Sequence, residues 1–79
     1  MTDLYPAADQ RELLRQAAAA HTAASADLEA FLRRLPEVPE PADITEFANL
    51  LSREERARGE RQDAADAAGL QLPSMESTD

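Results

Sequence analysis

The sequence LLRQAAAAHTAASADLEAFLRRL, residues 13–35, is the longest stretch that combines good helix formers with a sustained apolar stripe. Leucines stand at both of its ends, and alanines fill the interval between them. Pro36 biases the residue before it away from helical geometry, so the helix is expected to end at about Leu35. Because Pro6 is tolerated in a first turn, we predict one long helix over about residues 6–35.

Two apolar stripes can be drawn along this helix. The first takes alternate steps of four and three residues and passes through Leu14, Ala18, His21, Ser25, Leu28, Leu32 and Leu35. The second passes through Ala17, Ala20, Ala24, Leu28, Phe31 and Leu35. Alanines let a neighbouring helix approach closely, which favours close antiparallel packing. The alternative is that they only sustain helix propensity on a solvated surface.

The segment PEVPEPAD, residues 36–43, is the clearest break in the chain. Its prolines favour an extended connection and are incompatible with a helix interior. The segment is long enough to reverse the chain, so we interpret it as a connector between two helices.

A second helix is predicted over about residues 44–68. Asp43 followed by Glu46 resembles a capping box, and Ile44, Phe47 and Leu51 then share one face. The sequence is rich in Arg and Glu from residue 52 to residue 63, where Gly59 could mark a kink, a close crossing or the end of stable helix. Gly69 is placed to cap the helix, and we expect a flexible tail over about residues 70–79.

These elements predict an all-α fold, an antiparallel helical hairpin that forms one small domain over residues 1–79. Its core is thin, because 17 of the 79 residues are alanine and large apolar side chains are few. The chain has no cysteine, so neither a disulfide nor a thiolate zinc site can reinforce it. We therefore expect a helical bundle to be completed by self-association or by a protein partner.

Charge and composition narrow the classes of partner and location. The net charge of −8 argues against direct binding to nucleic acid or to an anionic membrane, both of which need a cationic surface. The sequence has no signal-peptide pattern and no apolar run of membrane-spanning length, so a cytoplasmic protein is expected. The excess of alanine and the use of arginine without any lysine suggest a coding sequence of high GC content, and hence a bacterial or phage origin.

Reactive groups do not converge anywhere in the sequence. His21 is the single histidine, and the positions three and four residues away from it carry only alanine and serine, which gives no metal-binding pattern. Glu54 and Glu55 stand among arginines and are expected to be ionised and solvated. There is no glycine-rich phosphate loop, so we predict no enzyme activity, cofactor, metal or small-molecule substrate.

The most consistent function is a non-enzymatic protein–protein interaction module that self-associates or docks on a partner protein. Two alternatives remain open: a small acidic inhibitor or antitoxin-like regulator that binds a basic site, and a structural component of a larger assembly such as a phage particle. No motif links the sequence to a family. The predicted interface residues are Leu14, Ala17, Ala24, Leu28, Phe31, Leu32, Leu35, Ile44, Phe47 and Leu51.

Overall fold

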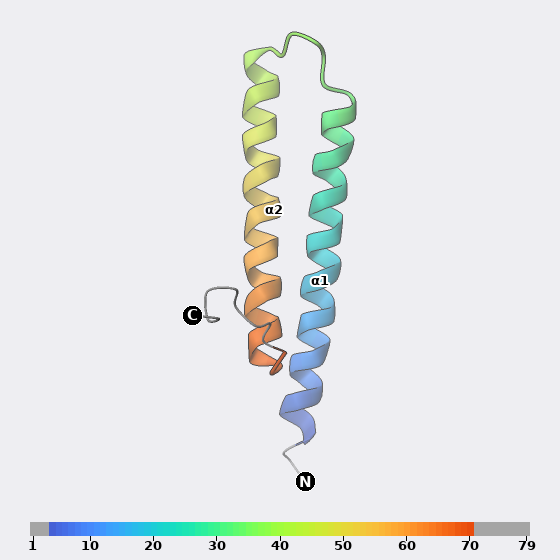
Figure 1. The fold of residues 1–79 in the computed structure, drawn as a ribbon, viewed down its shortest axis with the longest axis vertical. Helices are drawn as coiled ribbons and strands as arrows, with labels where there is room; N and C mark the ends of the chain where they lie inside the picture. Colours follow the sequence, from blue (N-terminus) through green and yellow to red (C-terminus); the bar gives the residue numbers. More distant parts are fainter. Residues whose placement is uncertain (1–3, 71–79) are drawn as a thin grey trace, which may run out of the picture.

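The chain forms two long helices, α1 (Leu4–Arg33) and α2 (Pro41–Ala67), which lie side by side and antiparallel (Figure 1). This computed structural model describes the backbone of residues 4–70 and the side chains of residues 9–70. No strand occurs within residues 4–70. The prediction of an all-α antiparallel hairpin is therefore confirmed, whereas residues 71–79 of the expected tail lie outside the described residues.

The end of α1 is tightened before the proline that stops it. The backbone N–H groups of Arg34 and Leu35 donate to the carbonyls of Phe31 and Leu32, at 3.1 and 3.4 Å, in bonds that span three residues instead of four. Since Leu35 directly precedes Pro36, it cannot easily hold the helical conformation. The regular helix thus ends at Arg33, two residues earlier than the sequence predicted.

The start of α2 differs from the prediction, and the capping box expected at Asp43 and Glu46 is wrong. The N-cap is Glu40, Pro41 occupies the first turn, and the Glu40 backbone N–H donates to the Asp43 carboxylate at 2.9 Å. Asp43 is therefore the third helical residue, in the place where a capping box has its returning acid. The physical reason is that Pro41 has no N–H to leave unpaired, so the first turn accepts it.

The helix α2 continues without interruption through Gly59 and ends in a glycine cap. Gly69 has a φ of 83°, its N–H donates to the Asp66 carbonyl at 3.0 Å, and the Leu70 N–H donates to the Ala65 carbonyl at 2.8 Å. This pair of bonds is a Schellman motif, which requires the left-handed conformation that glycine adopts without strain. The predicted role of Gly69 is confirmed.

The two helices meet along a seam that advances in alternate steps of four and three residues, as in antiparallel coiled coils. In α1 the seam comprises Gln10, Leu14, Ala17, His21, Ala24, Leu28, Phe31 and Leu35, all partly or fully buried. In α2 the same spacing gives Asp43, Phe47, Leu50, Glu54, Ala57, Arg61, Ala64 and Ala68. The Phe31 and Phe47 rings stack across this seam with centroids 6.4 Å apart, which fixes the alignment of the helices.

The core inside this seam is small. Among the described side chains, the buried apolar residues are Ala24, Phe31 and Ala57, and Phe31 is the large one, at 1% exposure. The alanines let the helices approach closely but remove little apolar surface from water. Neither α1 nor α2, within the described residues, is long and apolar enough to cross a membrane.

Candidate functional site

The structure divides the predicted interface residues into two groups. Leu14, Ala17, Ala24, Leu28, Phe31, Leu35 and Phe47 lie in the seam, where they hold α1 against α2. Leu32, Ile44 and Leu51 lie beside the seam. Only this second group is free of a role within the hairpin, so it is the part of the prediction that can serve another protein. That any of these residues contacts a partner stays a prediction.

The second group belongs to one side of the hairpin, which we call the open flank. It consists of the position that follows every second seam residue in each helix, and in an antiparallel pair these positions face the same side. Leu32 is 47% exposed and Ile44 is 61% exposed, although both are large apolar side chains. The open flank comprises Arg11, Ala18, Ser25 and Leu32 from α1, and Ile44, Leu51, Arg58 and Ala65 from α2.

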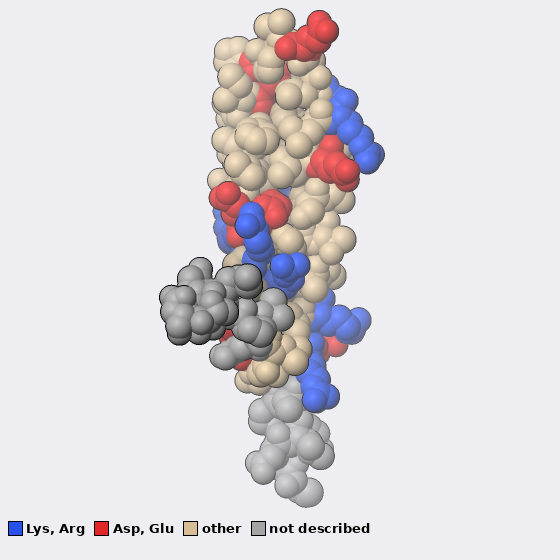
Figure 2. Space-filling model, viewed as in Figure 1, with Lys and Arg blue, Asp and Glu red and all other residues tan. Residues whose placement is uncertain are grey.

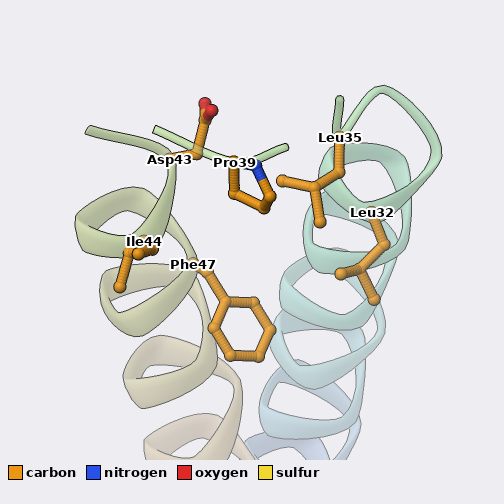
Figure 3. Close-up of a pocket in the computed structure, with 6 residues that line it drawn as sticks. All are labelled: Leu32, Leu35, Pro39, Asp43, Ile44 and Phe47. Carbon is orange, nitrogen blue, oxygen red and sulfur yellow. The ribbon is translucent and has the colours of Figure 1, made fainter. Parts of the chain in front are cut away.

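A hollow of about 230 Å³ lies at the connector end of the open flank (Figure 3). Leu32 and Phe47 point into it from the two helices, and Pro39 closes it from the connector. The Asp43 carboxylate points away from it and accepts the Glu40 N–H, so the hollow presents hydrocarbon. It is smaller than the roughly 300–1,000 Å³ that is typical of sites for drug-sized molecules. Its lining is Leu32, Leu35, Pro39, Asp43, Ile44 and Phe47.

The opposite side of the hairpin, which we call the ion-pair flank, is chemically different. Arg34 and Glu46 form a salt bridge between the helices at 3.0 Å, and Arg53 pairs with Asp27 across the same side. Each of these ions is about half exposed, so each pair adds little stability by itself. These pairs disfavour binding of an apolar partner to this flank, because such a partner would have to desolvate four charges there.

A polar layer crosses the middle of the seam. His21 Nε2 lies 2.8 Å from Glu54 Oε2, Arg58 donates to the other Glu54 oxygen at 3.1 Å, and Arg61 Nη1 lies 3.2 Å from His21 Nδ1. Arginine can only donate, so in this geometry Nδ1 accepts from Arg61 and Nε2 is the nitrogen that donates. The Nε2 proton is donated to Glu54. Both ring nitrogens are thereby satisfied in a part of the seam whose nearest apolar residues are Ala17, Ala24 and Ala57.

The environment of Glu54 corrects one prediction. Its side chain is only 13% exposed and His21 is only 14% exposed, so the expectation that Glu54 is solvated is wrong. The hydrogen bond from His21, and then the one from Arg58, lower the pKa of Glu54 below its ordinary value of 4.5. The contact between His21 and Glu54 joins residues 33 positions apart, which the local spacing around His21 could not reveal. A signal was present, because the steps of four and three from Phe47 place Glu54 in the seam.

The face shown in Figure 2 has its charged side chains mainly at the edges and across the middle, while the part near the connector is largely uncharged. Within residues 9–70, no group of three or more His, Cys, Asp or Glu side chains is arranged to hold a metal ion. The polar layer has one carboxylate and one imidazole, both already hydrogen-bonded. We therefore interpret it as a structural layer that aligns the helices.

Comparisons of the chain with protein-family models, with curated proteins and with solved structures found no match. The interpretation of function therefore rests on the surface itself.

Proposed function

We propose that this chain is a non-enzymatic protein–protein interaction module whose hairpin is completed by a second copy or by another protein. One observation carries the proposal: the hairpin fully buries a single large side chain, Phe31, among the described residues, while Leu32 and Ile44 remain exposed around an apolar hollow. Two helices that bury so little apolar surface gain little free energy from folding alone. A further surface that covers the open flank would supply the missing burial.

The arrangement of charge favours this function over an acidic inhibitor or antitoxin-like regulator. Such a regulator would present carboxylates to a basic target, but Glu54 is bonded to His21 and Arg58, and Glu46 is paired with Arg34. Glu55 and Glu60 remain exposed, so α2 keeps only part of the acidic surface that this alternative needs. A structural role in a larger assembly is compatible with the same open flank and differs in predicting ordered species larger than a dimer.

The test is the dependence of stability on concentration and on partners. Thermal unfolding should be followed by circular dichroism over at least a hundredfold range of protein concentration, together with molar mass by light scattering. We expect marginal stability at the dilute end and a midpoint that rises with concentration, or on addition of a cognate protein, by mass action. A monomer that shows a concentration-independent unfolding free energy of about 5–15 kcal/mol, ordinary for an independent domain, would contradict the proposal.

A further inference from the structure

We infer that the occupant of the open flank is a second copy of this chain, and that two hairpins pack through this flank with their connectors at the same end. This inference rests on the proposed function and deepens it, because it names the partner, the surface and the orientation. It is carried by the difference between the two flanks, by the area available and by the match between the flank and itself.

The difference in charge between the two flanks indicates which of them forms the dimer interface. Approach from the ion-pair flank would bury Asp27, Arg34, Glu46 and Arg53, which already pair with one another. The open flank presents no unpaired charge at its connector end. Its two arginines lie farther along: Arg58, in the middle, is bonded to Glu54, and Arg11 stands at the opposite end. Desolvation therefore opposes association much less on the open flank.

The area fits a dimer of ordinary size. A helix of 27 residues is about 40 Å long, and two packed helices are together about 20 Å wide. One flank thus offers on the order of 800 Å² per copy, which is what each partner contributes to a standard stable interface. Residues 71–79 span at most about 32 Å and so cannot reach the hollow at the connector end, because Leu70 lies about 40 Å along α2 from Ile44.

The pairing of flank residues across the dimer indicates how the two hairpins are oriented relative to each other. If a twofold axis runs parallel to the helices, α1 of each hairpin lies against α2 of the other, and every neighbouring pair is antiparallel. Leu32 then meets Ile44 of the second copy, and Ser25 lies opposite Leu51 of the second copy, so small residues face large ones. With connectors at opposite ends, each helix would lie against its own copy, and the exposed Leu32 and Ile44 would instead lie near Arg11 and Ala65 of the second copy. The exposed Leu32 and Ile44 cover one another only in the first arrangement.

Net charge supplies a signature that separates this dimer from a complex with a basic protein. Each chain carries −8, so two copies repel, and the repulsion is screened as salt is added. Self-association should therefore become tighter with increasing ionic strength. Binding to a basic partner would become weaker.

The orientation can be measured directly, because the sequence has no cysteine to interfere with site-specific labelling. Val38, 80% exposed in the connector, is changed to cysteine, spin-labelled and studied by pulsed electron paramagnetic resonance in the full-length chain. Connectors at the same end predict a distance between labels of roughly 20–30 Å, about the width of the bundle. Connectors at opposite ends predict roughly 40 Å or more, about the length of a helix.

Flank variants test the surface. L32D with I44D should raise the dimer dissociation constant on the order of 100-fold, since the apolar contacts at the connector end are replaced by unpaired carboxylates in each copy. The matched control is A20D, because Ala20 is exposed on the side of the ion-pair flank and should leave the dissociation constant within a few-fold. An unchanged constant for L32D with I44D, or a stronger effect of A20D, would overturn the choice of flank.

The outcomes distinguish this inference from the proposed function. A long distance between Val38 labels in a dimer would overturn the orientation and leave the interaction module standing. A monomer at all concentrations that is stabilised by another protein would overturn the second copy as occupant. A stable monomer that needs no partner would overturn both.

Discussion

His21 Nε2 and Glu54 Oε2 lie 2.8 Å apart at the centre of the seam, and Arg61 fixes the other nitrogen of the same ring from 3.2 Å away. This polar layer joins the middle of α1 to the middle of α2 by hydrogen bonds, which are directional. The surrounding alanines offer only shallow packing. The properties of the polar layer can be tested separately from those of the open flank.

The tautomer of His21 is a direct consequence of this geometry. At mildly alkaline pH, the imidazole should carry its proton on Nε2, because Nδ1 accepts from a guanidinium that has no acceptor site. The ¹⁵N chemical shifts of the ring, measured by long-range ¹H–¹⁵N correlation, report which nitrogen is protonated. R61A should allow the two tautomers to mix, whereas R56A, which changes an exposed arginine on the same helix, should not. A dominant Nδ1–H form in the unaltered chain would disprove the assignment.

The lowered pKa of Glu54 predicts a loss of stability in acid. A carboxylate whose pKa is lower in the folded state stabilises the fold above its ordinary pKa, and this contribution disappears as pH falls through the lowered value. The hairpin should therefore lose stability below about pH 4.5 in part through Glu54. The unfolding midpoint in urea should be lower for E54Q than for the unaltered chain at neutral pH, and the two should converge in acid. E55Q, at the adjacent exposed site, is the control, and a similar pattern in that variant would assign the effect elsewhere.

Phe31 is the largest fully buried side chain of the described core. Truncation to alanine, F31A, should destabilise the hairpin by about 3–5 kcal/mol, because it removes a fully buried ring and its stacking with Phe47. For so small a fold this is expected to abolish most of the helical circular dichroism signal at ambient temperature. V38A, at an exposed connector position, should change stability by less than about 0.5 kcal/mol. Retention of native helicity by F31A would show that the core extends beyond this ring.

The two glycines predict effects of opposite sign. A methyl group added at Gly59 meets nothing within 4 Å and sits inside a regular helix, so G59A should stabilise the hairpin by about 0.5–1 kcal/mol. Gly69 is equally open to space but has a φ of 83°, so G69A should destabilise it by about 1–2 kcal/mol through backbone strain. Urea unfolding of the two variants checks both values. Destabilisation by G59A would indicate that Gly59 faces another helix in the assembled protein.

The hairpin itself could be predicted from the sequence, because Pro36 and Pro39 interrupt two helical patterns of similar length. The position of the seam around α1 could not. Alanines occur on every side of the helix between Leu14 and Leu28, so two stripes fitted equally well, and each contributed only part of the observed seam. Stacking of Phe31 on Phe47 selects between them, and this contact becomes visible only when the helices are aligned.

The same ambiguity explains which features of the candidate site were missed. Leu32 and Phe31 are neighbours in sequence and were both predicted as interface residues, but one faces the flank and the other the seam. The exposure of Glu54 was predicted from its charged neighbours, although its spacing from Phe47 places it in the seam. Exposure follows from the angular position of a residue on the helix, and local composition does not determine that position.

The polar layer also limits how far the two helices can slide past one another. Over the alanines, displacement of α2 by one heptad would replace one shallow contact with a nearly identical one, so in this part of the seam, away from the Phe31–Phe47 stack, apolar packing distinguishes the alternatives poorly. The same displacement would separate Glu54 from His21 and leave a partly buried carboxylate without its principal donor. The layer thus serves as an internal reference point that rejects shifted pairings, a selectivity that the small side chains around it cannot supply.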